Sequence, residues 1–175
     1  MTRAARIILG YAVSVAVFAL VLPGAVIRLG TALDLTFALP RWRAQTVSIV
    51  LAAVLGAWGL FWMLWSWRFL VTRGRGHPTE AFGIEVSPVT RELVTGGPYA
   101  RTRNPMVFGY FFVLLAVAAY FGSAGMLVGI AVVAAIGWAQ IAYFEEPRLE
   151  RRFGEAYREY RRRVPRFLPL RRAGR

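Results

Sequence analysis

The sequence contains no cysteine and no lysine, and its only histidine is His77. The absence of cysteine excludes disulfides, thiolate nucleophiles and Cys-ligated metals, and the absence of lysine excludes a Schiff base and a P-loop. A zinc site built from histidines or a Ser-His-Asp triad would depend on one imidazole. We therefore expect neither a metal centre nor nucleophilic catalysis.

Negative charge is also scarce, because nine acidic residues stand against 22 arginines in a chain that is 57% hydrophobic. This composition does not describe a soluble domain of 175 residues and indicates an integral membrane protein. Arginines beside apolar spans anchor a protein to acidic lipid headgroups, so the net charge of +13 requires no nucleic acid partner.

Four apolar runs predict an all-α, polytopic membrane protein with about four transmembrane helices. They cover residues 7–27, 47–67, 106–121 and 124–144, and about 20 apolar residues suffice to cross a bilayer. Only Gly122 and Ser123 separate the last two runs, which predicts a tight helical hairpin over 106–144. A cleaved signal peptide is the alternative for the first run, but its apolar core would be shorter.

The distribution of arginine predicts the orientation of these spans. With a cytoplasmic N-terminus, 19 arginines lie on the inside and three, Arg28, Arg41 and Arg43, lie outside. Because positive residues concentrate in cytoplasmic loops, we expect both termini in the cytoplasm. The spans as drawn contain no charged residue, which argues against a pump or an ion-coupled transporter. An arginine-only basic composition also suggests a GC-rich coding sequence, hence a bacterial inner membrane.

The chain is predicted to have two parts. Residues 1–70 hold two spans and a short external loop, and residues 71–175 hold a cytoplasmic loop, the hairpin and an amphipathic helix over 148–164. Apolar residues three or four apart predict that helix, which we expect on the cytoplasmic bilayer surface. Aromatic residues between Trp58 and Phe69 are typical of an interfacial belt, with contact to a lipophilic acceptor as the alternative.

Charged residues mark both cytoplasmic ends of the predicted hairpin. Arg103 precedes it, and Glu145 and Glu146 follow it. Acidic groups are unfavourable at a helix C-terminus unless a cation offsets them. That cation is either Arg148, an arginine of the preceding loop, or a cationic ligand. Arg103 either anchors the helix at the membrane surface or forks onto a carboxylate or phosphate.

These motifs resemble the isoprenylcysteine carboxyl methyltransferase and phospholipid methyltransferase family of integral membrane enzymes. The resemblance lies in GGPYARTRNPMVFGY (96–110), in FEEPRLERRFGEAYREYRRRVPRFLP (144–169) and, more loosely, in RGRGHPTEAF. It implies methyl transfer from S-adenosylmethionine to a lipophilic acceptor that enters from the bilayer at the cytoplasmic face. An isoprenylcysteine-type carboxylate and a phospholipid amine both remain open as acceptors, and the oligomeric state stays undetermined.

The resemblance also implies residue roles. Arg103, Asn104 and Arg163 are expected to act at the substrate carboxylate or the cofactor. The expected cofactor-binding residues are Glu145, Glu146, Tyr99, Pro105, Met106, Gly109, Tyr157 and Tyr160. Asn104 stands where the eukaryotic enzymes have histidine, so an imidazole base is missing there. A carboxylate acceptor needs no base, whereas an amine does, and His77 could supply one only if its loop covers the cleft.

Two other functions are also compatible with the sequence. A membrane reductase of related architecture would use NADPH, and the many arginines could bind its 2′-phosphate. A non-catalytic membrane scaffold or small transporter is disfavoured by the specific motifs at the hairpin ends. Titration with the candidate cofactors separates these alternatives.

Overall fold

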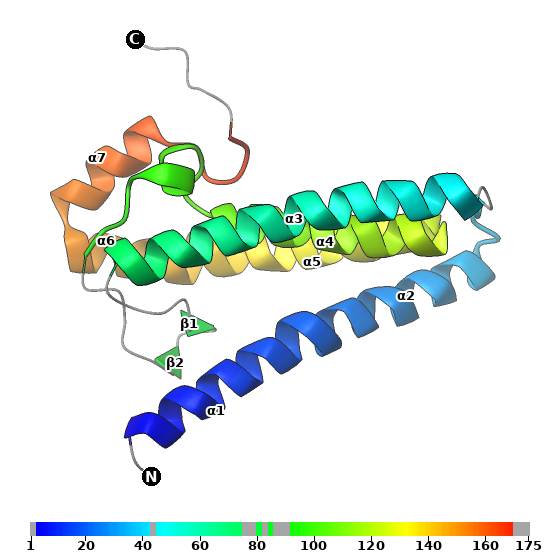
Figure 1. The fold of residues 1–175 in the computed structure, drawn as a ribbon, viewed down its shortest axis with the longest axis horizontal. Coiled ribbons are helices and arrows are strands. Elements are labelled where there is room, and N and C mark those ends of the chain that lie inside the picture. The colour runs from blue at the N-terminus through cyan, green and yellow to red at the C-terminus, as the bar shows by residue number, and fades with distance from the viewer. Residues whose placement is uncertain (1–2, 43–44, 75–79, 82–83, 86–91, 170–175) are drawn as a thin grey trace. The chain divides into compact units, whose positions relative to one another are not determined.

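The computed structural model describes residues 3–42, 45–74, 80–81, 84–85 and 92–169, and His77 lies outside them. The regular elements of the described chain are helices and one antiparallel pair of short strands, β1 (Glu80–Ala81) and β2 (Ile84–Glu85), as Figure 1 shows. It divides into two compact units. The first comprises residues 1–14, 62–108 and 139–175, and the second comprises residues 15–61 and 109–138.

The predicted all-α membrane fold is confirmed. Three apolar segments are long enough to cross a membrane, namely Ile8–Thr36, Gln45–Arg73 and Ala124–Phe153, and a shorter apolar helix covers Pro105–Phe121. The helices that form or overlap these segments are α1 (Arg3–Ala16), α2 (Leu22–Thr36), α3 (Gln45–Arg73), α4 (Pro105–Phe121) and α5 (Ala124–Gln140). The tight turn between α4 and α5 is the predicted one, with Gly122 at φ +59°.

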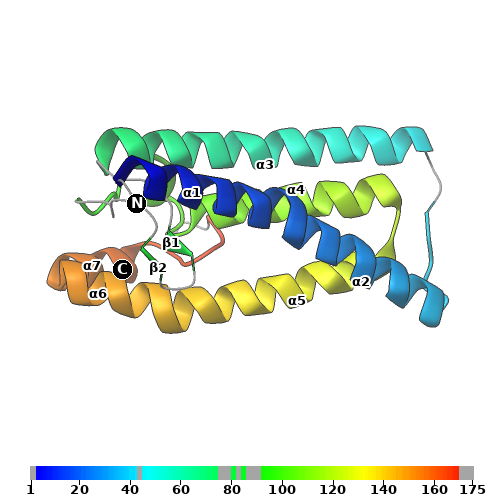
Figure 2. The same cartoon turned by 90° about the horizontal axis from the view of Figure 1, so that it is seen from below.

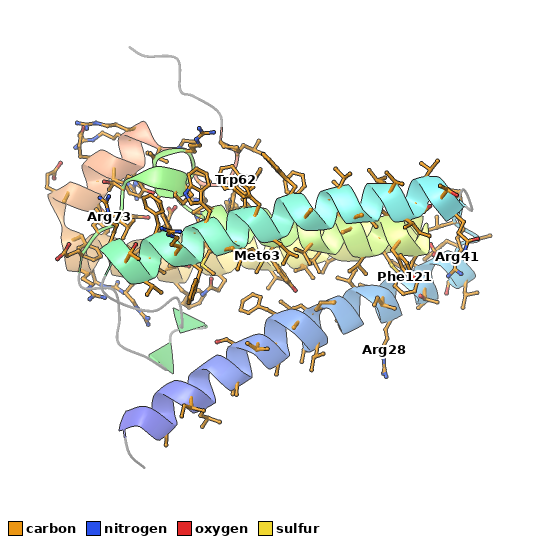
Figure 3. The ribbon with its side chains drawn as sticks, in the orientation of Figure 1. Arg28, Arg41, Trp62, Met63, Arg73 and Phe121 are labelled. Carbon is orange, nitrogen blue, oxygen red and sulfur yellow. The ribbon has the colours of Figure 1, made fainter. Side chains whose placement is uncertain are left out.

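The first apolar helix extends beyond the predicted boundary at Ile27. No proline follows before Thr36, so α2 continues to that residue and carries Arg28 and Asp34. Arg28 is exposed on α2, where Figure 3 shows its side chain. Asp34 is 4% exposed. Residues 7–27 carry no charge, as predicted, but the apolar segments of the structure extend beyond the predicted bounds and include charged residues at their ends, Arg28 and Asp34 here and Arg68 and Arg73 in Gln45–Arg73.

Asp34 connects α2 to the turn of the α4–α5 hairpin in the second unit. Its Oδ1 accepts a 2.7 Å hydrogen bond from the Gly125 amide, and its Oδ2 lies 3.0 Å from Arg41 Nε. Glycine at 125 allows this approach, because a Cβ there would collide with the backbone of Gly30. The buried carboxylate thus stabilises the N-terminus of α5 from a neighbouring helix.

Two π-helical turns interrupt the apolar helices, at Val17–Val21 and Ile141–Glu145. In each turn a backbone amide bonds the carbonyl five residues earlier, as Glu146 does with Ile141. Both turns end two residues before a proline, Pro23 or Pro147. A proline ring clashes with the carbonyl four residues earlier and donates no hydrogen bond, so the wider turn relieves the clash.

The C-terminal segment differs from the single predicted helix over 148–164. Helix α5 passes through the second π turn into α6 (Glu146–Phe153), as seen in Figures 1 and 2, and α7 (Glu155–Arg163) follows. Gly154 separates α6 from α7 because its φ of +56° is incompatible with a continuous helix. The apolar stripe packs inward: Tyr157, Tyr160 and Val164 form a buried cluster with Leu93, Leu149 and Phe153.

Candidate active site

The predicted charged residues come together in the first unit, at the segment that leads into α4. This segment contains a 3-10 turn at Gly97–Ala100, and Pro105 opens α4. Gly97 has a φ of +59°, and a Cβ at this position would collide with the ring of Phe69. Proline suits the first helical position because the amide it lacks would have no partner there. The sequence thereby fixes where Arg103 and Asn104 lie.

Backbone hydrogen bonds fasten the end of the described chain onto residues 102–104. The Arg103 amide donates to the Pro165 carbonyl at 2.9 Å. The Arg166 carbonyl accepts from both Thr102 Oγ1 and Asn104 Nδ2, each at 3.0 Å. Two segments that are about 60 positions apart in the chain are thus held side by side.

Glu146 is the buried carboxylate at the centre of the site, with 3% exposure. Its Oε1 lies 2.6 Å from Arg103 Nη1 and 3.0 Å from Arg166 Nε, and its Oε2 lies 2.7 Å from Arg166 Nη2. The hydrogen bond with Glu146 raises the pKa of Arg166 above its usual value, so this arginine stays charged. Arg166 uses the forked geometry typical of a strong arginine–carboxylate pair, whereas Arg103 makes an end-on contact.

Arg103 retains unsatisfied hydrogen-bonding capacity. Its side chain is 9% exposed, and within the described part of the chain its Nε has no hydrogen-bond acceptor. Nη1 is close enough to Glu146 for an ion pair but is not directed along a hydrogen bond. A buried donor without an acceptor costs about 1–3 kcal/mol, which a ligand oxygen would recover.

Three tyrosines surround these charges. Arg103 hydrogen-bonds the side chain of Tyr157, and the Tyr160 hydroxyl donates a 2.7 Å hydrogen bond to the Tyr99 carbonyl. Burial raises the pKa of Tyr157 to about 12 and also raises the pKa values of Tyr99 and Tyr160, the former with a contribution from the charge of Glu145. All three phenols are therefore neutral near pH 7, and none is a base there.

The comparison with protein families agrees with this arrangement. A model of the phospholipid methyltransferase family matches residues 47–156, well over half of the chain. The chain belongs to this family. The comparisons with curated proteins and with solved structures gave no match. The matched range contains the segment before α4, the hairpin and both glutamates, but it ends before Tyr157.

In this member of the phospholipid methyltransferase family, most of the predicted site residues are neighbours in the structure. Six of them lie in the cluster just described: Arg103, Asn104, Glu146, Tyr99, Tyr157 and Tyr160. Glu145 is half-buried and acts electrostatically on Tyr99. Pro105 is buried at the start of α4, and Met106 follows it, half-buried.

Two predicted residues lie elsewhere. The Gly109 carbonyl packs against Gly59 of α3 in the second unit. The Arg163 side chain is 74% exposed and pairs with Glu159 at 2.5 Å, whereas Arg166 makes the contacts with Glu146. Pro165 explains the difference, because the residue before a proline is driven out of helix and Val164 is extended, at φ −110° and ψ 130°. The sequence motif does not predict the contact of Arg166 with Glu146. The signal for it is Pro165, which ends the helix and turns the chain just before Arg166.

Proposed function

We propose that this membrane methyltransferase moves a methyl group from S-adenosylmethionine to a lipophilic carboxylate at the cytoplasmic face of the membrane. The observation that carries the proposal is the buried Arg103–Glu146–Arg166 cluster, in which Arg103 Nε has no acceptor among the described residues. Family membership supports methyl transfer in general. It also favours this function over the NADPH-dependent reductase and the scaffold.

The residues present fit the functional groups of S-adenosylmethionine. When bound, this cofactor supplies a methyl group on a positively charged sulfur. Its amino-acid end carries a carboxylate, for which the unsatisfied Arg103 Nε is a suitable donor, and an ammonium, for which Glu145 is a suitable acceptor. Tyr99 and Tyr157, neutral phenols at the edge of this cluster, add hydrogen-bonding capacity without extra charge.

The choice of a carboxylate acceptor follows from the lack of an available base among the described residues of the site, which do not include His77. Burial raises the pKa values of the three tyrosines of the site, so they are neutral near pH 7, and Glu146 is paired with two guanidinium groups. Asn104 replaces the imidazole and donates its amide hydrogen to a carbonyl. A carboxylate is already ionised at neutral pH, whereas a phospholipid ammonium would have to lose a proton before attack.

The cytoplasmic placement rests on the distribution of arginine. The segments next to the site, α6, α7 and the stretch before α4, are rich in arginine, and α6 and α7 expose most of theirs. This is the pattern of cytoplasmic anchoring beside acidic headgroups. We extend it to a bacterial inner membrane with both ends of the chain inside.

The test begins with cofactor binding by protein purified in detergent. Isothermal titration with S-adenosylmethionine and S-adenosylhomocysteine should show saturable binding that Arg103→Gln and Glu145→Gln weaken. Arg163→Gln is the matched control, because Arg163 is exposed and pairs with Glu159 outside the cluster. Absence of cofactor binding by folded wild-type protein, with NADPH binding in its place, would overturn the proposal.

The acceptor is tested by transfer of a tritiated methyl group. An S-farnesylated cysteine derivative and phosphatidylethanolamine are supplied separately in mixed micelles. A methyl ester releases volatile methanol in alkali and an N-methyl group does not, so the two products are distinguished directly. Label found only in phosphatidylethanolamine would contradict the carboxylate acceptor while leaving methyl transfer intact.

A further inference from the structure

The geometry points to a function for Arg166 that the sequence motif does not assign. We propose that Arg166 is a positioning residue: it occupies Glu146 so that Arg103 keeps a donor for an anionic oxygen of the ligand. This inference rests on the proposed function, because it concerns the same site. The anionic oxygen belongs either to the cofactor carboxylate or to the acceptor carboxylate.

The division of contacts around Glu146 is the first step. An arginine binds a carboxylate most strongly when two of its nitrogens reach both oxygens as a fork. Arg166 makes that fork, with Nε on Oε1 at 3.0 Å and Nη2 on Oε2 at 2.7 Å. Arg103 contacts Oε1 through Nη1, and within the described residues its Nε has no hydrogen-bond acceptor. Its Nε is therefore not consumed by the carboxylate beside it.

The backbone of Arg166 supplies the second step. Its carbonyl accepts hydrogen bonds from Thr102 and Asn104, the two residues that flank Arg103. Arg166 therefore contacts the Arg103 region through both its backbone and its side chain. Its carbonyl accepts hydrogen bonds from the residues on either side of Arg103, and its guanidinium binds Glu146, the carboxylate that pairs with Arg103. This double attachment fixes the direction of the Arg103 side chain relative to Glu146.

Burial gives the third step. Glu146 and Arg103 have side-chain exposures of 4% and 9%, whereas Arg166 has 27%. If the Arg166 side chain is shortened, water can replace part of its guanidinium. The buried pair of Arg103 and Glu146 is much less accessible to water. Without the Arg166 fork, Glu146 would turn its second oxygen to Arg103 and engage Nε. The donor for the ligand would then be lost although Arg103 itself is unchanged.

The experiment compares Arg166→Gln, Arg166→Lys and the control Arg163→Gln in the full-length protein. Affinity is measured for S-adenosylmethionine and for its decarboxylated analogue, and thermal unfolding is followed in parallel. If the oxygen belongs to the cofactor, Arg166→Gln should weaken S-adenosylmethionine by about tenfold or more, as expected for a lost charged hydrogen bond, and should barely change the analogue. If it belongs to the acceptor, both affinities persist and the KM for farnesylated cysteine rises to a similar extent.

Arg166→Lys keeps the charge but cannot form the fork, so it should fold and show an intermediate effect. Equal behaviour of Arg166→Gln and Arg163→Gln in both assays would overturn the positioning role. If Arg166→Gln cannot fold, Arg166→Lys decides the question. Wild-type affinity of Arg166→Lys would then overturn the positioning role, because a positive charge without the fork would be sufficient for ligand binding. A wild-type protein that binds no cofactor would instead contradict the proposed function, which keeps the two failures distinct.

Discussion

The side-chain amide of Asn104 donates a 3.0 Å hydrogen bond to the backbone carbonyl of Arg166. This contact assigns a structural use to the position where eukaryotic relatives are expected to carry histidine. A histidine can also donate a ring N–H, so both residue types can hold the same carbonyl. The amide at 104 thereby orders the segment that brings Arg166 to Glu146.

Asn104→His should accordingly retain cofactor binding, whereas Asn104→Asp should lose it. A carboxylate at position 104 would face the Arg166 carbonyl without a proton to donate, and it would add a second negative charge near Glu146. We expect at least a tenfold loss of S-adenosylhomocysteine affinity for the aspartate variant, the size of one charged contact. Wild-type affinity of Asn104→Asp in isothermal titration would contradict the role given to this hydrogen bond.

Gly97→Ala should destabilise the first unit, which contains the candidate active site, whereas Gly96→Ala should be tolerated. Gly97 has a φ of +59°, and a Cβ there would collide with atoms of the Phe69 ring, whereas a Cβ at Gly96 would meet nothing within 4 Å. Strain at a positive φ costs about 1–3 kcal/mol, and the clash with the ring adds to it. The measurement is the thermal unfolding midpoint in detergent. Equal midpoints for the two variants would refute the assigned conformation of Gly97.

Pro147→Ala should weaken cofactor binding without removing a ligand-contacting group. If the clash of the proline ring causes the π turn at Ile141–Glu145, its removal allows a regular helix and rotates Glu146 away from Arg103. Pro23→Ala is the matched control, because Pro23 stands in the same relation to the turn at Val17–Val21. Titration of both variants with S-adenosylhomocysteine tests this, and equal affinities would count against it.

Stability should fall as the pH rises from about 10 to about 12, partly because of Tyr157. Burial raises the pKa of Tyr157 to about 12 from 10.0, so the unfolded chain loses this proton first. Its contribution is complete below pH 10 and decreases by up to about 1.4 kcal/mol per pH unit until the folded state also ionises. Tyr157→Phe should flatten this slope in alkaline unfolding curves. An unchanged slope would show that the phenol is not protected.

The hairpin and the meeting of its charged ends could be predicted from the sequence, because length, turn residues and charge determine them. Gly122 and Ser123 leave no other place for the turn, and an antiparallel pair must return Glu146 to the side of Arg103. The identity of the second arginine could not be predicted in this way. Arg161, Arg162 and Arg163 are consecutive and lie in one helix, so the sequence does not show which arginine of this region pairs with Glu146. The backbone turn at Pro165 brings Arg166 to Glu146 instead.

The sequence pattern also did not predict the helix break at Gly154 or the extension of α2 to Thr36. An apolar stripe continues through Gly154 with helical spacing, since α6 and α7 both contribute to one buried cluster. Hydropathy likewise ended the first span at Arg28, although a single exposed arginine does not stop a helix. Such boundaries depend on backbone dihedral angles and on packing partners distant in the chain.

The contacts of Asp34 impose an order of events during synthesis of the protein. The Gly125 amide that Asp34 binds emerges 91 residues later. At a synthesis rate of about 5–20 residues per second, roughly 5–20 s separate the synthesis of Asp34 from that of Gly125. Arg41 follows only seven positions after Asp34, so its guanidinium can neutralise the charge throughout this interval. The ion pair of Asp34 with Arg41 therefore needs only residues that are synthesised before the hairpin.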